Sequence, residues 1–471
     1  MFTPLLRFIT LERYKVKNYF THSVLALSLL ISGFSPAINA AENTFEIPPK
    51  VLRKFAEVYS AVKSQYVDAV DDEKFLKDAI SSAVAGLDPH SNYLDLEGLK
   101  DFGIATGGEF GGVGIEVMMD KDELKVVSPI EDTPAFKAGM KTGDLITSID
   151  GMPVKGLPLG DAIKKIRGKA GSSVVLSVSR KDESAPLRFT LVRSTIKNPS
   201  VKYKLNNPEY PYLRVTQFQE NTGRDLAKTL VDIAEQSDNK LKGLVLDLRN
   251  NPGGVVTSSI AVASAFIKKD KLIVYSDGKT PDSRMRLFSN PQNYSGPNPE
   301  DDYMSVVPPK FKEIPLVVLI NGGSASASEI VAGAIQDHKR GKIIGTQSFG
   351  KGTIQTLLPL SDGSAVKITV ARYYTPSGRS IQAKGIVPDI TVEETKEGNK
   401  DKVASIREAD LPNHIQDKGV DKSSKKSTLS AEAIAALEQK QYADRAVSEL
   451  GTDKDYQYMQ AVEFLKNSEK R

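Results

Sequence analysis

Apolar and polar positions alternate in a way that divides the central part of the chain into strands and helices. Residues 315–320 and 342–345 are short apolar runs with Pro or Gly at their borders, a pattern typical of strands covered on both faces. Between them, a glycine-rich turn at 321–323 leads into a helix of small residues that begins at Ser324 or Ser326. This order of strand, turn and helix predicts a serine hydroxyl at a helix N-terminus, where backbone N–H groups have no partner within the helix.

Five further segments continue this pattern on both sides. Residues 212–215, 243–249 and 365–374 predict strands. Residues 222–235 predict an amphipathic helix, and residues 255–267 predict a second helix. Strands that alternate with helices indicate a layered α/β core.

The region before residue 97 is predicted to be helical. Residues 51–67 carry apolar side chains at helical spacing, and residues 73–87 predict a second helix that ends in a proline-bearing turn. Asp88 and His90 lie in this turn. Because Asp and Pro favour turns, we expect the two residues to shape the turn rather than to form a site.

Two polar stretches interrupt the regular pattern. Residues 276–310 are rich in Pro, Asn and Asp around a strand-like segment, and internal loops of this length are often lids or binding elements. Residues 396–426 are charged with few apolar positions, which predicts a flexible linker. Residues 431–450 and 456–465 then predict helices with apolar stripes, which leaves two partners open: a second copy of the chain or the core itself.

Composition limits the class of protein. A chain of 471 residues predicts about three or four domains, and 40% hydrophobic with 26% charged residues is typical of globular proteins. The net charge of +4 arises mainly from the first 41 residues, since the remainder holds 59 basic and 58 acidic side chains. Nothing in this balance indicates nucleic-acid binding. The absence of cysteine excludes disulfides, thiolate chemistry and Cys-metal sites.

The N-terminus has the pattern of a secretory signal. A basic segment at residues 7–17 precedes an apolar run at 23–34 and small residues that end at Ala40 and Ala41. The apolar run is shorter than the ~20 residues that a membrane-spanning helix needs. We therefore expect export to an extracytoplasmic, periplasmic location, with segment 1–41 either removed near Ala40 or retained as a membrane anchor.

The predicted helix N-terminus suits a serine nucleophile, because free backbone N–H groups there can form an oxyanion hole. The structural alternative is that the serine is only an N-cap. The four histidines do not supply an obvious base: His22 lies in the leader, and His90 and His414 lie in peripheral charged segments. His338 is twelve residues beyond Ser326 on the same predicted helix, which separates them by about 18 Å. A Ser-His-Asp triad is thus poorly supplied, whereas a Ser-Lys pair is a known variant.

Lys351 is the candidate base, between Gly350 and Gly352. A lysine can act as a base only if its pKa falls from about 10.4 towards neutrality, which burial without a paired carboxylate achieves. The residues next to Lys351 in the sequence are not acidic. Gln355 lies four positions further on and could hold the amine without adding charge.

Two sequence blocks, GSASASEI and FGKGTIQ, resemble the carboxyl-terminal processing (tail-specific) serine peptidases. The resemblance implies that Ser326 is the nucleophile, Lys351 the base and Gln355 the residue that orients it. A further block, DLRNNPGG, implies that the N–H of Gly253 or Gly254 forms an oxyanion hole with that of Ala327. The other polar residues of this block, Asp247 and Arg249, end a predicted buried strand, so we favour a structural ion pair or a role in fixing the turn.

Residues 110–117, 133–140 and 143–146 resemble a PDZ domain in their order of glycine loop, strand, helix and turn. A phosphate-binding loop is a weaker alternative, because neither GK[ST] nor GxGxxG follows. A PDZ domain binds the C-terminus of a peptide as an added strand. The resemblance implies that the carboxylate loop and strand are Gly112, Val113, Gly114 and Ile115. Arg167 lies where related peptidases couple peptide binding to activation; the alternative is a solvated surface arginine.

The resulting fold class is multidomain α/β, with a crotonase/ClpP-like layered α/β peptidase core, an inserted PDZ domain and helical ends. The predicted divisions are a signal peptide or anchor (1–41), an N-terminal helical region (42–96), the PDZ domain (97–194), the peptidase core (195–394), and a charged linker with C-terminal helices (395–471).

The predicted function is that of an exported serine endopeptidase, which recognises protein C-termini through its PDZ domain and cleaves upstream without a metal or organic cofactor. An activating adaptor and self-association are left open. The alternatives are a non-proteolytic PDZ binding protein on an inert peptidase fold, and a crotonase-like enzyme acting on acyl thioesters.

Overall fold

The computed structural model describes residues 47–120, 122–181, 183–238, 240–396, 398, 406–417 and 449–468. The predicted leader (1–41) and nearly all of the predicted helix at 431–450 lie outside these residues. The chain divides into two compact units, residues 1–71 and 72–471. No described helix has both the length and the apolar character needed to cross a membrane.

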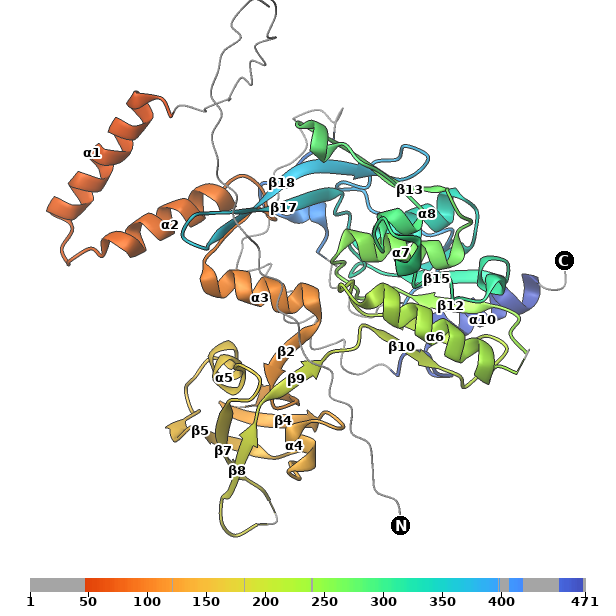
Figure 1. Ribbon diagram of the computed structural model, residues 1–471, viewed down its shortest axis with the longest axis horizontal. Helices are drawn as coiled ribbons and strands as arrows, with labels where there is room; N and C mark the ends of the chain where they lie inside the picture. The colour runs from red at the N-terminus through yellow and green to blue at the C-terminus, as the bar shows by residue number, and fades with distance from the viewer. Residues whose placement is uncertain are drawn as a thin grey trace, which may run out of the picture. The chain divides into compact units, whose positions relative to one another are not determined.

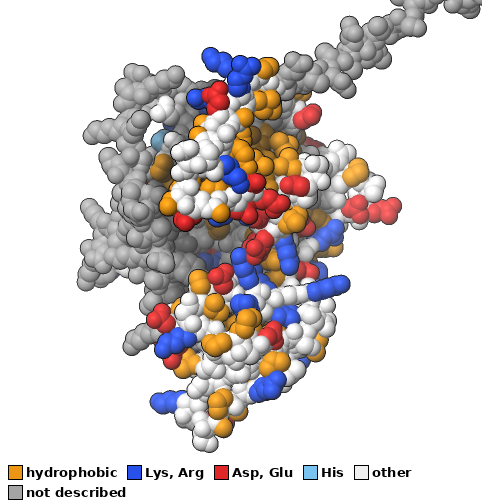
Figure 2. Space-filling view, turned by 90° about the vertical axis from the view of Figure 1, so that its left-hand side faces the viewer, with side chains coloured by type: hydrophobic (Ala, Val, Ile, Leu, Met, Phe, Trp, Pro, Cys, Tyr) orange, Lys and Arg blue, Asp and Glu red, His pale blue; other side chains and the backbone are white. Residues whose placement is uncertain are grey.

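The first unit contains helix α1 (Pro49–Gln65), which corresponds to the helix predicted at 51–67. Proline at the first helical position fits a helix start, because its missing N–H would have no partner there. None of the 17 residues of α1 is buried, and its apolar stripe is exposed at Val51, Leu52, Phe55 and Val58. Figure 2 shows hydrophobic side chains among charged ones on one face of the protein surface.

The second unit is built around a six-stranded sheet in which all neighbouring strands are parallel except the first pair. The helices cover both faces of this sheet (Figure 1). In sheet order the strands are β10 (Val201–Lys204), β11 (Tyr212–Val215), β12 (Leu244–Asp247), β15 (Leu316–Ile320), β16 (Lys342–Gly345) and β19 (Ile390–Thr391); α6 (Thr222–Gln236), α7 (Val256–Phe266) and α8 (Ala327–Asp337) cover one face, and α10 (Tyr456–Ser468) covers the other.

Side-chain alternation along β12 shows how this core is assembled. Leu244 and Leu246 are fully buried in the cluster with α6, α7 and α8, whereas Val245 is buried in the cluster with α10. Because successive strand residues point to opposite faces, Asp247 points to the α10 side. Its neighbour in the parallel strand β11, Arg214, lies on the same face. The apolar alternation thus places two charged residues beneath α10.

A second sheet is attached to the first through α8 and the strands that follow it. Its strand order is β1 (Asn92–Leu94), β18 (Ala365–Tyr374), β13 (Leu272–Gly278) and β14 (Arg286–Phe288), and β17 (Thr353–Pro359) also pairs with β18. Strand β14 is the strand-like part of the predicted loop at 276–310. The rest of that loop contains the short 3₁₀ helices η1 (Pro281–Ser283), η2 (Pro291–Asn293), η3 (Pro299–Asp301) and η4 (Pro309–Lys312).

Helices α2 (Asp72–Ala85) and α3 (Leu96–Gly107) flank the proline-bearing turn and strand β1. The carboxylate of Asp88 accepts hydrogen bonds from the backbone N–H groups of His90 (2.9 Å) and Ser91 (3.0 Å) and from the Ser91 hydroxyl (2.7 Å). The predicted capping role of Asp88 is therefore confirmed.

The PDZ region forms its own sheet and its own buried core. Strand β3 lies at one edge of the sheet, so its outer side is available to an added strand. The sheet order is β3 (Ile115–Asp120), β4 (Glu123–Pro129), β5 (Leu145–Ile149), β7 (Ser173–Ser179) and β8 (Leu187–Val192), with β6 (Met152–Pro153) beside β5; β2 (Glu109–Gly112) pairs with β9 (Ser194–Lys197), and the helices are α4 (Pro134–Lys137) and α5 (Leu159–Ile166).

The prediction of a flexible linker at 396–426 is wrong for residues 406–417. Ile406 and Glu408 are buried, and the 3₁₀ helix η5 (Glu408–Asp410) follows. The local sequence is charged, so hydrophobic periodicity gave no sign of this order. The segment is held instead by hydrogen bonds to residues far away in the sequence, such as the one from the Glu408 N–H to the Phe349 carbonyl (3.1 Å).

Candidate active site

Two serines compete for the start of α8, and the structure separates them. Ser326 is the N-cap residue, whereas the Ser324 hydroxyl is buried and donates to the Leu248 carbonyl (2.7 Å). Ser326 has φ 54° and ψ −112°, a backbone conformation that non-glycine residues rarely adopt and that is often found at functional sites. Its side chain is partly exposed and forms, with Glu329, the capping box at the start of α8.

A buried carboxylate joins the segment of Ser326 to that of Lys351. Oε2 of Glu329 accepts the backbone N–H groups of Ser326 (2.7 Å) and Lys351 (3.0 Å). Oε1 accepts the Ser348 hydroxyl (2.6 Å) and the Gly350 N–H (2.7 Å). Burial raises the pKa of Glu329 to about 7, although these four donors favour the ionised form. One side chain therefore holds the two proposed catalytic residues beside each other.

Tyr373 on β18 makes a second connection between the same segments. Its hydroxyl lies 3.0 Å from the carbonyl oxygen of Ser326 and is also hydrogen-bonded to the carbonyl oxygen of Lys351. Burial raises the pKa of Tyr373 well above its ordinary value, so the hydroxyl keeps its proton and remains a donor.

Lys351 lies in the loop that leads to β17. Its pKa is lowered to about 8, chiefly by burial and secondarily by the cation of Lys367, while the carboxylates of Glu408, Glu329 and Asp88 act in the opposite direction. This is the direction that the sequence-based hypothesis of a lysine base requires.

The side chains of the proposed triad are not hydrogen-bonded to one another in the described structure. The Lys351 amine forms no hydrogen bond with Ser326 or Gln355 in the described part of the chain. The Gln355 amide instead donates to the hydroxyls of Thr353 (3.0 Å) and Thr369 (3.1 Å). Catalytic hydrogen bonds are often long or absent without substrate, so this geometry is compatible with a resting state.

Of the two glycines predicted to form the oxyanion hole, Gly253 lies directly against Ser326, whereas Gly254 lies against the backbone of Phe218. A Cβ added to Gly253 would lie 2.8 Å from the Ser326 Cβ and 3.0 Å from the Ala327 nitrogen. The Gly253 N–H, however, already donates to Oδ1 of Asn251 (2.9 Å). The N–H groups of Gly254 and Ala327 have no hydrogen-bond partner among the described residues. Of the two glycines left open by the sequence, Gly254 is therefore the available donor.

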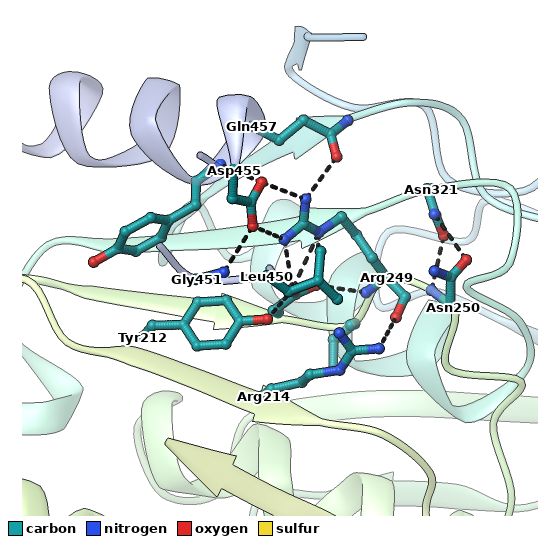
Figure 3. Close-up of polar contacts among 12 residues, drawn as sticks. Tyr212, Arg214, Arg249, Asn250, Asn321, Leu450, Gly451, Asp455 and Gln457 are labelled. Atoms are coloured by element: carbon teal, nitrogen blue, oxygen red, sulfur yellow. Dashed lines mark hydrogen bonds and ion pairs between the residues drawn. The ribbon is translucent and has the colours of Figure 1, made fainter. Parts of the chain in front are cut away.

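The loop of these glycines is fastened to the serine turn by paired polar groups (Figure 3). Asn250 donates its N–H to Oδ1 of Asn321 (2.9 Å), and Nδ2 of Asn321 donates to Oδ1 of Asn250 (3.0 Å). The Asn251 carbonyl accepts the Ala325 N–H (3.0 Å) and the Ser328 hydroxyl (2.9 Å). The proposed oxyanion donors and the nucleophile are thus held by one hydrogen-bond network.

Arg249, directly before this loop, is the centre of a buried ion network (Figure 3). Its guanidinium contacts Asp247 (2.7 Å) and Asp455 (2.6 Å), and donates to Gln457 (2.9 Å). Tyr212 donates to Asp247 (2.5 Å). Burial opposes ionisation of Asp247, but Arg249 lowers the pKa of that carboxyl below its usual value. The structural ion pair predicted for Asp247 and Arg249 is confirmed, and it joins the α10 region to the oxyanion loop.

Three residues near the proposed catalytic loops, Val256, Ile330 and Ile354, line a mostly apolar void together with Val274, Tyr275, Ser276, Met285 and Leu287. The void is too small to admit a water molecule, so it forms no pocket for a substrate side chain in this structure. Among the described residues, no cluster of three His, Asp or Glu side chains is arranged to hold a metal ion.

The predicted peptide-binding residues lie together at the start of the PDZ sheet edge. Gly112 ends β2, Ile115 begins β3, and Val113 and Gly114 connect them, with Gly114 at φ +78°. Arg167 lies elsewhere in the same domain, at the end of α5, where its guanidinium stacks 4.5 Å above the ring of Phe110. The structure shows no hydrogen bond or ion pair between Arg167 and the described residues of the peptidase core.

Sequence reasoning missed several residues around Lys351. Glu329 follows Ser326 at the Ser-x-x-Glu spacing of a capping box, a signal that could have identified it. Tyr373 and Glu408 carry no local signal. His90 was predicted to be peripheral, but its Nε2 lies 2.8 Å from Oε2 of Glu408, with only 16% of its side chain exposed. That prediction is wrong because the partner of His90 lies more than three hundred residues away in the sequence.

Comparisons with known proteins agree with this architecture. Residues 209–392 match peptidase family S41, residues 111–191 match the PDZ domain, and residues 29–98 match the N-terminal domain of the activating protease CtpB. Fold and matches together define a serine-type peptidase that carries a PDZ domain.

The chain belongs to peptidase family S41, among the carboxy-terminal processing proteases. It is 44% identical over 396 residues to a carboxy-terminal-processing protease of Bartonella bacilliformis, covering 84% of this chain and 86% of that protein. It is 35% identical over 349 residues to the carboxy-terminal processing protease CtpB of Bacillus subtilis, covering 73% and 68%. The solved photosystem II D1 C-terminal processing protease aligns with a TM-score of 0.39 at 31% identity, covering 74% of this chain and 94% of that one.

Proposed function

We propose that this protein is an exported endopeptidase with a Ser326–Lys351 dyad, which binds protein C-termini through its PDZ domain and cleaves upstream of them. The observation that carries the proposal is the Glu329 carboxylate, which holds the backbones of Ser326 and Lys351 together. A lysine with a lowered pKa, whose backbone shares the Glu329 carboxylate with that of a partly exposed serine, supports nucleophilic catalysis.

The proposed reaction begins with transfer of the Ser326 hydroxyl proton to the neutral Lys351 amine. The serine oxygen bonds to the carbonyl carbon of the scissile peptide, and the carbonyl electron pair moves to its oxygen. The N–H groups of Gly254 and Ala327 stabilise this oxyanion, and one such donor typically contributes about 3 kcal/mol to transition-state stabilisation. Lys351 then gives the proton to the leaving amine, and water hydrolyses the acyl-enzyme with Lys351 again as base.

Gln355 is proposed to orient the lysine. Its amide nitrogen already donates to Thr353 and Thr369, so its carbonyl oxygen is the atom available to accept an N–H of the Lys351 amine.

The PDZ domain is proposed to select the substrate. The segment from Gly112 to Ile115 would receive the terminal carboxylate on its backbone N–H groups, and the free edge of β3 would pair with the peptide. We further propose that Arg167 leaves Phe110 when a peptide binds, which would couple binding to activation.

Export and partners are proposed on different grounds. The basic and apolar pattern of residues 1–41 supports export, with the segment either removed or kept as an anchor. The exposed apolar stripe of α1 supports self-association or binding of an activating adaptor, because such a surface is rarely left in water.

A pair of substrates tests C-terminal recognition. An unfolded protein with a free C-terminus should be cleaved at internal sites, as mass spectrometry of the products would show. Removing its last few residues, or amidating the terminal carboxylate, should reduce kcat/KM by about tenfold or more, because the added-strand contacts and carboxylate cap are lost. Equal cleavage of both substrates would contradict the proposed role of the PDZ domain, and tight binding without cleavage would favour the non-proteolytic alternative.

The pH dependence tests the lysine base. Lys351 is active only when neutral and its pKa is lowered to about 8, so kcat/KM should increase by about tenfold per pH unit below that value and level off above it. Glu329, with a pKa raised to about 7, should add a second and lower inflection. Steady-state kinetics on a peptide without ionisable side chains would show this profile, and a flat rate between about pH 6 and pH 9 would contradict it.

A further inference from the structure

Residues 406–417, beyond the part that matches the peptidase family, lie against the loop of Lys351. The Glu408 N–H donates to the Phe349 carbonyl (3.1 Å), two residues before the lysine. The side chain of Gln382 donates to Oε1 of Glu408 (2.9 Å) and accepts the N–H of Gly352 (2.9 Å), the residue after the lysine. Glu408 is therefore connected to the lysine loop on both sides of Lys351.

The second carboxylate oxygen of Glu408 is held from the N-terminal region. Oε2 lies 2.8 Å from Nε2 of His90, and the Glu408 side chain is fully buried. His90 belongs to the turn that Asp88 caps, and Asp88 in turn accepts a hydrogen bond from the Thr369 hydroxyl (3.1 Å), which contacts Gln355. Segments from both ends of the chain thus meet beside the proposed catalytic lysine.

The charged groups that face Lys351 come from four elements: Lys367 on β18, Glu329 on α8, Asp88 in the N-terminal turn, and Glu408. Glu329 accepts four hydrogen bonds from the loops that it joins. Asp88 accepts hydrogen bonds from its own turn and from Thr369. Glu408 differs because its carboxylate accepts only two side-chain hydrogen bonds in the described structure, from His90 and Gln382. Among the anions, it also contributes most to the charge state of Lys351.

We propose that Glu408 is a positioning residue for the peptidase reaction, which fixes the Lys351 loop through Gln382 and stabilises the ammonium that forms on Lys351. The inference rests on the proposed Ser326–Lys351 dyad. When the Ser326 O–H bond breaks, the proton moves to the lysine nitrogen and creates a positive charge in a buried site. A nearby buried carboxylate stabilises this charge, as the aspartate of a serine-protease triad stabilises the imidazolium.

Removing the negative charge has two opposite effects on the rate. Without it the ammonium of Lys351 is less stable, so the inflection of the pH–rate profile should move to lower pH, by on the order of one unit. Above the inflection, kcat should fall, by on the order of tenfold, because the ammonium formed in the transition state is also less stable. The wild-type and variant profiles should therefore cross.

Two variants of the full-length protein separate charge from shape. Glu408→Gln removes the charge and keeps the size, whereas Glu408→Asp keeps the charge and shortens the side chain. Asp455→Asn is the matched control, because Asp455 is also a buried carboxylate but pairs with Arg249 rather than facing Lys351. Each is assayed over about pH 6 to pH 10, a range that brackets the expected inflection. Rates are normalised to active sites counted with a fluorophosphonate that labels the serine, so loss of folded protein does not affect the comparison.

The proposal predicts that the inflection of the pH–rate profile moves to lower pH only in Glu408→Gln. In Glu408→Asp and Asp455→Asn the inflection should stay at the wild-type pH. An unchanged inflection in Glu408→Gln, or an equal shift in all three, would overturn it. If too little Glu408→Gln folds to be titrated, Lys367→Met provides a second measurement. Removal of the Lys367 cation should move the inflection of the pH–rate profile to higher pH. The same upward shift should appear when Lys367→Met is combined with Glu408→Asp. Absence of that shift would also overturn the electrostatic account. Failure of the dyad itself would be distinguished by activity that survives loss of Ser326 or Lys351.

Discussion

Ser326→Ala is expected to reduce peptide-bond cleavage by at least about 10⁴-fold, because loss of the nucleophile in a serine peptidase removes nearly all of its rate enhancement. The fold should be retained, since the Ser326 backbone N–H remains bound by Glu329 and only the N-cap hydroxyl is lost, at a cost of about 1 kcal/mol. The measurement is cleavage of an unfolded protein, with circular dichroism to verify folding. Ser324→Ala is the matched control: its hydroxyl bonds to the Leu248 carbonyl, so it should affect stability more than chemistry.

Lys351→Met should be equally inactive and yet more stable than the wild type. Burial lowers the pKa of Lys351 in the folded state to about 8, whereas the unfolded chain has the ordinary value near 10.5. The buried ammonium therefore disfavours folding below pH 8, and this cost disappears as the pH rises to about 10.5, at about 1.4 kcal/mol per pKa unit. Urea denaturation should show that Lys351→Met gains most at neutral pH. Full activity in either variant would contradict the dyad, and a loss of stability in Lys351→Met would contradict a buried lysine.

Arg249→Met is expected to lower the free energy of unfolding by about 3–5 kcal/mol, because it leaves Asp247 and Asp455 buried without their counter-charge. The loss should be largest near neutral pH and smaller in acid. In the wild type Arg249 lowers the pKa of Asp247 in the folded state. The resulting stabilisation is fully present above the ordinary pKa of an aspartate, and it is lost as the pH falls through the lowered pKa of the folded state. In the variant the unpaired carboxyls take up protons more readily, so the two proteins converge.

Lys454→Met is the control for this experiment. Lys454 lies next to Asp455 but pairs with Glu449 at the surface, with 72% of its side chain exposed. Such pairs contribute little, so we expect a change of at most about 0.5 kcal/mol. Chemical denaturation monitored by circular dichroism measures both variants. A loss as small for Arg249→Met as for Lys454→Met would show that the α10 network does not stabilise the core.

Much of the fold follows from local sequence. Apolar runs bounded by turn residues predicted β16 and β18 with the bounds that the structure gives, and β15 and α6 within one residue. These segments are long or strongly apolar, so their burial and their local preference agree. The charged segment at 406–417 did not follow this rule, because it is ordered by a few long-range hydrogen bonds that leave no periodic trace.

The sequence by itself determined the family, the α/β and PDZ architecture, and the candidate residues Ser326, Lys351 and Gln355, because motif spacing and periodicity are local properties. Only the tertiary structure decided which glycine N–H remains free, that Glu329 and Tyr373 hold the segments of Ser326 and Lys351 together, and that Glu408 and His90 contact each other near the lysine loop. The physical reason is that hydrogen-bond partners and burial depend on residues that meet only after the chain has folded, and these contacts set the pKa of Lys351.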